Sequence, residues 1–325
     1  MSFSQTVKDE LVDVTAKARH CELAELAALL AMAGKIKSAP DGTCTLKIST
    51  ENQNVVTKAQ LLIHRAFGYE SDILVRDNNK EKKEEKEENH HNATYVLSIA
   101  DREVAVKILQ GTRLMDADGY VNEDLSLVNT TGISNSCCKR AYLRGAFCTC
   151  GSISDPEKSY HLELVTGSRH KAEQLVEAMR PFELEAHIVE RRKNYVVYLK
   201  EGSQIVDMLN VMGAHKSLMD LENVRILKEM RNSINRQVNC ETANMSKTIN
   251  AAVKQVEDIR FIQQTAGLGS LKEGLYEIAE LRLANPDMPL KELGELLSPP
   301  VGKSGVNHRL RKISEIADDL RRTKL

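Results

Sequence analysis

Two apolar, alanine-rich segments of the chain share one nine-residue pattern. Residues 26–34 read Leu-Ala-Ala-Leu-Leu-Ala-Met-Ala-Gly, and residues 143–151 read Leu-Arg-Gly-Ala-Phe-Cys-Thr-Cys-Gly. Each predicts a helix that stops at its glycine, because glycine can take the positive φ that ends a helix. Small side chains on one stripe of each helix predict close packing between the two. The expected contact residues are Ala27, Ala28, Ala31, Gly145 and Ala146.

The segments that follow these two helices also correspond to each other. After each helix the pattern predicts a strand, an apolar helix and a second strand. The paired segments are 45–50 and 161–166, 55–67 and 172–179, and 71–76 and 185–190. The offset is 117 residues between the helices (26 to 143) and 116 between the first strands (45 to 161). The alternative is two ordinary alanine-rich helices, but self-similarity at a fixed offset favours a duplicated unit.

The remaining segments of this half complete the two repeats. Residues 4–16 predict a lead-in helix, with Val7, Leu11 and Val14 on one stripe. Residues 77–92 contain no apolar side chain, which predicts a disordered insertion between two strands. Residues 115–136 are rich in Asp, Gly, Asn, Ser and Thr and suit a linker between the repeats. The basic turn 191–193 has two open interpretations, a contact to DNA phosphates or a solvated hairpin tip.

Residues 215–263 predict helices with a polar break in the middle. The break covers residues 236–244, with Thr242 as the N-cap of the following helix. The segment 267–269 reads Gly-Leu-Gly and predicts a hinge. Ser270 and Glu273 fit a capping box that opens the next helix, and Pro289 fits the first residue of a short amphipathic helix.

A longer amphipathic helix is predicted at 303–322, after the turn 298–302. Its apolar stripe is Val306, Leu310, Ile313, Ala317 and Leu320. A short helix, a tight turn and a longer helix form a helix-turn-helix, whose second helix enters the DNA major groove. The opposite face carries the side chains that we expect to contact base edges: Ser304, Asn307, His308 and Arg311. The flanking side chains suit phosphates: Lys303, Arg309 and Lys312. The alternative is a helical hairpin with a solvated basic face.

Composition limits the other classes of function. The chain has 325 residues, enough for roughly two domains, and a net charge of −1, so any basic DNA-binding surface must be local. It lacks an apolar run of the roughly 18 residues that a membrane span needs, so we expect no membrane partner. It also lacks a signal-peptide pattern at its start, which favours the cytoplasm. Within the cytoplasm we expect the protein to associate with the nucleoid.

The seven cysteines form no C-x-x-C pair. A zinc site from Cys137 and Cys138 with Cys148 and Cys150 therefore lacks the usual ligand spacing, and we predict no metal and no cofactor.

The two nine-residue patterns match the frame Leu-Ala-Gly-Leu-Ile-Asp-Ala-Asp-Gly, and the repeat order resembles the LAGLIDADG homing endonucleases. In that family the last acid of each helix holds a divalent metal. Those positions are Ala33 and Cys150 here, and neither offers the carboxylate oxygens that Mg²⁺ requires. The resemblance therefore implies an inherited scaffold without its nuclease chemistry. A metal-dependent endonuclease using Asp41 or Asp155 is the alternative, but both lie in turn sequences.

Three further blocks resemble the WhiA family. They are Phe3-Ser-x-x-Val-Lys-x-Glu-Leu11, Asn235-Arg-x-x-Asn-Cys-x-x-Ala-Asn-x-x-Lys247 and the segment 290–313. The resemblance implies a non-enzymatic, DNA-binding transcriptional regulator of sporulation, cell division or chromosome segregation. It also implies promoter DNA as a partner, with another transcription factor or RNA polymerase as further candidates. The duplicated domain then serves as a second DNA surface or as a protein-interaction module.

These observations predict an α+β fold with a three-part organisation. Residues 1–212 form the duplicated domain, with repeats at about 21–114 and 136–210 and saddle-shaped antiparallel sheets. Residues 213–267 form an all-α linker, and residues 268–325 form the helix-turn-helix domain.

Overall fold

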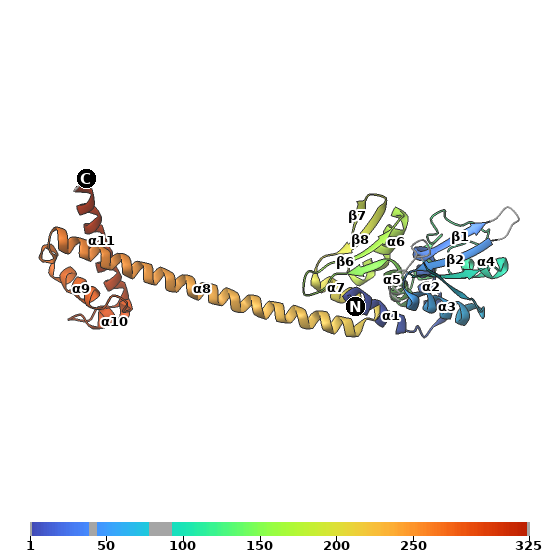
Figure 1. Ribbon diagram of the computed structural model, residues 1–325, viewed down its shortest axis with the longest axis horizontal. Helices are drawn as coiled ribbons and strands as arrows, with labels where there is room; N and C mark the ends of the chain where they lie inside the picture. Colours follow the sequence, from blue (N-terminus) through green and yellow to red (C-terminus); the bar gives the residue numbers. More distant parts are fainter. Residues whose placement is uncertain (1, 39–43, 78–92, 324–325) are drawn as a thin grey trace, which may run out of the picture. The chain divides into compact units, whose positions relative to one another are not determined.

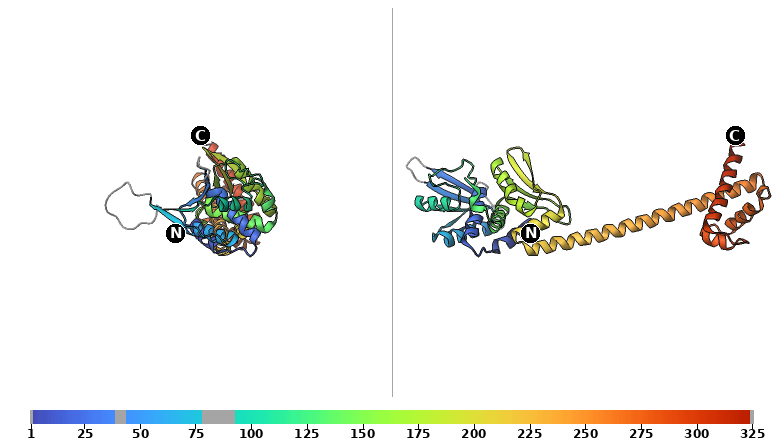
Figure 2. Two further views of the ribbon diagram at one scale, coloured as in Figure 1. Left: turned by 90° about the vertical axis from the view of Figure 1, so that its right-hand side faces the viewer. Right: turned by 180° about the vertical axis from the view of Figure 1, so that it is seen from behind.

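The protein divides into two compact units, Met1–Lys228 and Glu229–Leu325. The computed structural model describes residues 2–38, 44–77 and 93–323. The first unit combines helices with antiparallel sheets, and the second unit is helical (Figure 1). Figure 2 shows each unit from two further sides. The fold class is therefore α+β, as predicted.

The first unit contains two copies of one supersecondary arrangement. The first copy comprises α2 (Arg19–Ala33), β1 (Gly34–Ser38), β2 (Cys44–Thr50), α3 (Gln53–Phe67), β3 (Ile73–Asp77), β4 (Ala93–Ile99) and α4 (Arg102–Gly111). The second comprises α5 (Ser136–Cys150), β5 (Gly151–Ile153), β6 (Leu162–Thr166), α6 (Arg169–Met179), β7 (His187–Arg191), β8 (Asn194–Leu199) and α7 (Gly202–Met212). The strand orders are β1-β2-β4-β3 and β5-β6-β8-β7. This equivalence confirms the internal repeat.

Helices α2 and α5 lie side by side between the two sheets (Figures 1 and 2). They lie close together at Gly145, where an added Cβ would lie 2.6 Å from the carbonyl oxygen of Glu25 and 3.1 Å from the Cβ of Ala28. The predicted stripe of small residues is therefore the contact surface.

The prediction that terminal glycines stop these helices by positive φ was wrong. Gly34 and Gly151 have φ of −81° and −84° and lead directly into strands. A Cβ at Gly34 would overlap the carbonyl oxygen of Leu30, and one at Gly151 would overlap the ring of Phe147. Close approach to the last helical turn, and not backbone freedom, is what these two positions require.

A buried ionic cluster crosses the α2–α5 contact. Glu25 is fully buried, and its Oε2 accepts a hydrogen bond of 2.7 Å from Nη2 of Arg144 while its Oε1 accepts one of 3.0 Å from Nε. Lys58 Nζ lies 2.6 Å from Oε1 of Glu25 and also donates to the carbonyl oxygens of Leu11 and Val14. Leu11 belongs to α1 (Phe3–Asp13), so the cluster joins the lead-in helix to both repeats.

The segment between the repeats is packed and is not a loose linker. It contains a 3₁₀ helix, η2 (Thr130–Ile133), and buries Leu125 and Leu127. Within the predicted insertion, Asp77 is the last residue of β3, and residues 78–92 lie outside the described residues. A second 3₁₀ helix, η3 (Arg180–Phe182), follows α6.

Helix α8 (His215–Thr265) is continuous, so the predicted break at 236–244 was wrong. The segment 215–265 contains neither glycine nor proline, and a polar composition alone does not interrupt backbone hydrogen bonding. The polar residues of the predicted break are exposed helical positions, and Thr242 is one of them.

The described helices include none with both the length and the apolar character that a membrane span needs.

The second unit packs three helices against the end of α8. These are α9 (Glu273–Ala284), α10 (Leu290–Glu295) and α11 (Lys303–Thr323), preceded by the 3₁₀ helix η4 (Leu268–Ser270). Their core contains Ile259, Ile262, Leu275, Ile278, Leu293, Val306, Leu310 and Ile313. The predicted capping box was wrong, because α9 begins at Glu273 and the Ser270 hydroxyl donates to the carbonyl oxygen of Gly267. Pro289 is the N-cap of α10 and not its first residue.

Candidate nucleic-acid interface

The candidate DNA-contacting side chains lie on the first half of α11. The apolar stripe of this helix faces the core, with Val306, Leu310, Ile313 and Ala317 buried and Leu320 half-buried. The opposite face leaves exposed the side chains of Lys303, Ser304, Asn307, His308, Arg311 and Lys312. A single rigid helix therefore brings six of the seven predicted residues to solvent.

Arg309 differs from the other six. Its side chain is half-buried, and its Nη1 donates to the carbonyl oxygen of Gly274 in α9 at 3.3 Å. This guanidinium therefore helps to fix α11 against α9. Arg311 stays exposed, with its Nε 3.8 Å from a carboxylate oxygen of Glu315, a weak pairing that a stronger acceptor can replace.

The turn between α10 and α11 is held by close backbone packing. Gly294 accepts a hydrogen bond of 2.9 Å from the Val301 amide, and a Cβ at Gly294 would overlap the carbonyl oxygen of Val301. Between α9 and α10, the buried Arg282 of α9 donates to the carbonyl oxygens of Pro286 and Met288. Burial lowers the pKa of Arg282, and nearby Asp287 partly offsets this. The first contact fixes the α10–α11 turn, and the Arg282 bonds hold the connection between α9 and α10.

The far half of α11 is anchored to α8 within the same unit. Arg321 Nη2 lies 2.7 Å from a carboxylate oxygen of Asp258, which is 1% exposed. The Arg321 guanidinium also lies 4.8 Å from the ring centroid of Phe261. The far half of α11 is therefore held against α8 through Arg321, and the basic first half of the helix is left for a ligand.

A groove runs beside the start of α11. Its lining includes Lys247 of α8, Lys291 of α10, and Lys303 and Asn307 of α11, together with Ile249, Ala252 and one acidic residue, Asp287. Three ammonium groups next to a predicted base-contacting residue make a local positive surface on a protein of net charge −1. Such a surface suits the phosphates that flank a recognition helix.

The first unit keeps the endonuclease frame but has different groups at the positions of its metal-binding acids. Ala33 and Cys150 are the last residues of α2 and α5, and the Cys150 thiol donates to the carbonyl oxygen of Ala146. Two lysines lie close by: Lys171 donates to the carbonyl oxygen of Ala31 at 2.5 Å, and Lys8 interacts electrostatically with Cys150. Burial lowers the pKa of both lysines. An ammonium group at this place repels a divalent cation.

Among the described residues, the candidate acid Asp155 of the nuclease alternative belongs to no cluster of possible metal ligands. Asp155 is exposed, and its carboxylate accepts a hydrogen bond of 3.0 Å from the backbone amide of Glu157, which confirms its role as a turn former. Asp41 lies outside the described residues.

Two basic surfaces lie on the sheets. In the first sheet, the register places Lys35 opposite Lys47 and Arg76 opposite Thr94, on the face away from the buried Leu46 and Ile48. In the second sheet, the turn 191–193 connects β7 and β8, with Arg192 at φ 58°. Arg191 lies 3.5 Å from a carboxylate oxygen of Glu163. The first sheet thus carries its cations together, and the second pairs one of its cations with an acid.

The four cysteines that the sequence analysis considered for a zinc site do not lie together. Cys137 and Cys138 lie near the start of α5 and Cys148 and Cys150 at its end, about 15 Å apart at 1.5 Å per residue. Cys137 and Cys138 instead lie beside His20 and Cys21 at the start of α2. A search for ligand motifs within one segment does not find this group. The 117-residue repeat offset does relate its members, because it pairs position 20 with 137 and position 21 with 138.

Comparison with known proteins covers almost the whole chain. Three family models match: the WhiA N-terminal LAGLIDADG-like domain at residues 19–115, the WhiA LAGLIDADG-like domain at 139–231 and the WhiA C-terminal HTH domain at 234–317. The chain is 48% identical over 321 residues to the protein named "Probable cell division protein WhiA" of Lachnoclostridium phytofermentans, covering 99% of this chain and 100% of that one. It is also 48% identical over 326 residues to the protein of that name from Alkaliphilus oremlandii, covering 100% and 99%.

A solved structure has the same fold. It is full-length DUF199/WhiA from Thermatoga maritima, with a TM-score of 0.58 and 21% identity, covering 98% of this chain and 99% of that one. With the three family models and the full-length relatives, this places the chain: it belongs to the WhiA family.

Proposed function

We propose that this protein is a non-enzymatic transcriptional regulator that recognises duplex DNA with helix α11. One observation carries the proposal: the first half of α11 leaves Ser304, Asn307, His308 and Arg311 exposed on one face while Val306 and Leu310 are buried on the other. These exposed side chains are of the types that hydrogen-bond base edges in the major groove.

The roles within this interface follow from position and charge. Arg311 presents a planar guanidinium suited to bidentate binding of guanine, and Asn307 presents an amide suited to adenine. Lys303 and Lys312, together with Lys247 and Lys291 of the groove, suit the phosphates on either side. Arg309 acts mainly by holding α11 in place, because its side chain already donates to α9.

The proposed biological role rests on the relatives. They are named probable cell division proteins, and we propose that this chain acts in the nucleoid at promoters of genes for cell division, chromosome segregation or sporulation, with another transcription factor or RNA polymerase as a partner.

Three charge changes on α11 test the proposal in the full chain. A genome-wide binding map first supplies a specific duplex, and a scrambled duplex serves as the nonspecific ligand. Arg311→Ala is expected to weaken specific binding by roughly 1–3 kcal/mol and to relax discrimination at one base pair. Lys312→Ala is expected to weaken both duplexes alike and to lower the salt slope by about one unit. Arg322→Ala is the matched control, because it removes an exposed arginine from the last turn of the same helix.

Equal losses on specific and scrambled DNA for Arg311→Ala would contradict base recognition by this helix. Plasmid cleavage in Mg²⁺ or Mn²⁺ that Asp155→Ala abolishes would overturn the non-enzymatic assignment and restore the nuclease alternative.

For the duplicated domain we propose a second, sequence-independent DNA contact through the first sheet. Lys35, Lys47 and Arg76 on one face favour phosphates over an apolar protein partner. The isolated unit 1–228 should then bind random duplex with an affinity that falls steeply with salt. If it shows no salt-sensitive affinity, the domain is better explained as a protein-interaction module.

A further inference from the structure

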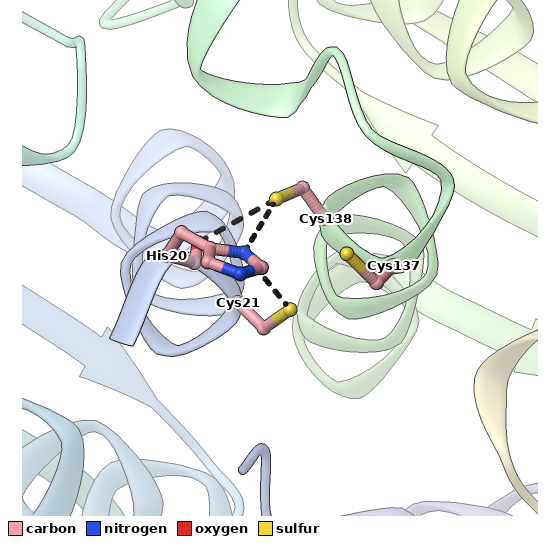
Figure 3. A group of neighbouring side chains, drawn as sticks. All are labelled: His20, Cys21, Cys137 and Cys138. Carbon is pink, nitrogen blue, oxygen red and sulfur yellow. Dashed lines mark hydrogen bonds between the residues drawn. The ribbon is translucent and has the colours of Figure 1, made fainter. Parts of the chain in front are cut away.

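Four metal-ligating side chains converge where the N-terminal ends of the two repeat helices meet. His20 and Cys21 are the second and third residues of α2, and Cys137 and Cys138 are the second and third residues of α5. Figure 3 shows the four side chains directed toward one another across the helix pair. One ligand atom of each lies within 4.8 Å of all the others. His20 Nδ1 is 3.2 Å from the Cys138 sulfur and 3.3 Å from the Cys21 sulfur.

The group obeys the internal symmetry of the fold. The offset that relates α2 to α5 pairs His20 with Cys137 and Cys21 with Cys138, so each repeat supplies two adjacent ligands. The inner pair, Cys21 and Cys138, is buried, and the outer pair, His20 and Cys137, is exposed. A cation therefore has two firmly packed ligands and an open approach from solvent.

The donor set selects the metal. Three sulfurs and one imidazole are soft and borderline ligands that suit Zn²⁺ in a closed tetrahedral site, and they do not suit Mg²⁺ or Ca²⁺. Zn–S bonds of about 2.3 Å and Zn–N bonds of about 2.0 Å in a tetrahedron separate the ligand atoms by roughly 3.5–3.8 Å. The ligand atoms of the group already lie within 4.8 Å of one another, so they must draw together by about 1 Å to reach this geometry.

The electrostatic surroundings favour the metal-bound state. Three thiolates, one neutral imidazole and Zn²⁺ leave one net negative charge. This charge would lie at the N-terminal ends of two helices, where the helix dipole stabilises anions. The cavity beside Cys21 and Cys137 is also lined by Lys17 and Arg140. Both features offset the charge that the thiolates bring.

We propose that His20, Cys21, Cys137 and Cys138 bind one Zn²⁺ ion that joins the two repeats at the start of α2 and α5. The site has a structural role, because four protein ligands leave no open position for a substrate. Binding then stabilises the pairing of the repeats, since the unfolded chain does not assemble the site.

Metal analysis of the full chain tests this proposal. The protein is purified with reductant, dialysed against Zn²⁺ and then against buffer, and measured by inductively coupled plasma mass spectrometry. Wild type is expected to retain one zinc per chain. The double variant His20→Ala/Cys137→Ser, which changes only the exposed ligands, is expected to lose it. Cys240→Ser is the matched control, because Cys240 is an exposed cysteine of α8 outside the group, and it should keep the zinc.

A spectroscopic readout separates this site from adventitious binding. Co²⁺-loaded wild type should show the intense visible bands of tetrahedral cobalt and a thiolate-to-cobalt charge-transfer band, and the double variant should lack both. Circular dichroism confirms that the variant is folded. A wild type that retains no zinc, a double variant that retains as much as wild type, or a Cys21–Cys137 or Cys21–Cys138 disulfide in protein purified with reductant would overturn the proposal.

Discussion

The buried carboxylate of Glu25 should be the most sensitive charged position of the first unit. It is fully buried and faces two cations, Lys58 at 2.6 Å and Arg144 at 2.7 Å, whose side chains are 4% and 8% exposed. Unit charges at these distances attract by about 6 kcal/mol per pair at an effective dielectric constant near 20. Burying three charges costs several kcal/mol for each ion, so the cluster as a whole contributes little net stability.

Removal of one partner has a much larger effect than the net contribution of the cluster. Glu25→Gln keeps the shape but leaves two buried cations facing an amide. Lys58 retains its bonds to the carbonyl oxygens of Leu11 and Val14, and Arg144 retains its bond to that of Met212, so the chain still folds around them. We expect a loss of about 3–5 kcal/mol, the range for a buried pair that loses one member.

Hydrogen exchange of the full chain, followed by mass spectrometry, measures this loss in α2 and α5 alone, apart from the second unit. The double variant Glu25→Gln/Arg144→Met should lose less than the sum of the two single variants, by roughly 1–3 kcal/mol, because it removes a cation together with the anion. Two results would refute a charge cluster that acts as one unit. One is a free energy of unfolding for Glu25→Gln within about 1 kcal/mol of wild type, and the other is a double-variant loss equal to the sum of the single-variant losses.

Two further predictions concern the same unit. Gly145→Ala should destabilise it by about 1–3 kcal/mol although alanine is the better helix former, because the new Cβ would meet the backbone of Glu25 at 2.6 Å. Gly202→Ala, where the nearest atom is 3.5 Å away, is the control in the same exchange measurement, and equal effects would argue against a close helix contact. Burial alone raises the pKa of Asp124, but hydrogen bonds from Ser126 and Ser168 and the charge of Lys171 outweigh it, so the pKa lies below its usual 3.8. The stability that Asp124 contributes is therefore complete above about pH 4 and is lost as pH falls through the lowered pKa. When the free energy of unfolding is measured against pH, Asp124→Asn should reduce the loss of stability in acid. An unchanged loss would contradict the assignment.

The sequence predicted the elements whose apolar periodicity is strong. The repeat order, the close α2–α5 contact and the buried stripe of α11 follow from residue size and spacing, because these patterns are satisfied within one or two elements. The continuity of α8 was missed for the opposite reason. Its middle has no buried face to give a periodic signal, and the absence of glycine and proline was the better indicator.

Sequence reasoning about sites was limited by which segments meet in space. The exposure of six of the seven α11 residues could be predicted, because one helix carries them all, but the contact of Arg309 with α9 could not. The group at His20 could not be found from ligand spacing, since its members come in adjacent pairs from two segments more than a hundred residues apart. The repeat offset is the signal that could have found it, because the same 117 residues that relate the apolar positions also relate Cys21 to Cys138.

The C-terminal ends of α2 and α5 are electrostatically better suited to lysine than to a carboxylate. Helix C-terminal ends disfavour carboxylates unless a metal neutralises them, and they favour cations. Here the Lys171 ammonium donates to the carbonyl oxygen of Ala31 in the last turn of α2, and Ala33 and Cys150 bring no charge. An aspartate at position 150 would lie at an unfavourable end of the helix dipole, and its carboxylate would pair with Lys8 and Lys171, whose charges already interact with Cys150. Because this end is already electrostatically satisfied by lysine, restoring the acids alone should not restore a metal site; the lysines would have to be removed as well.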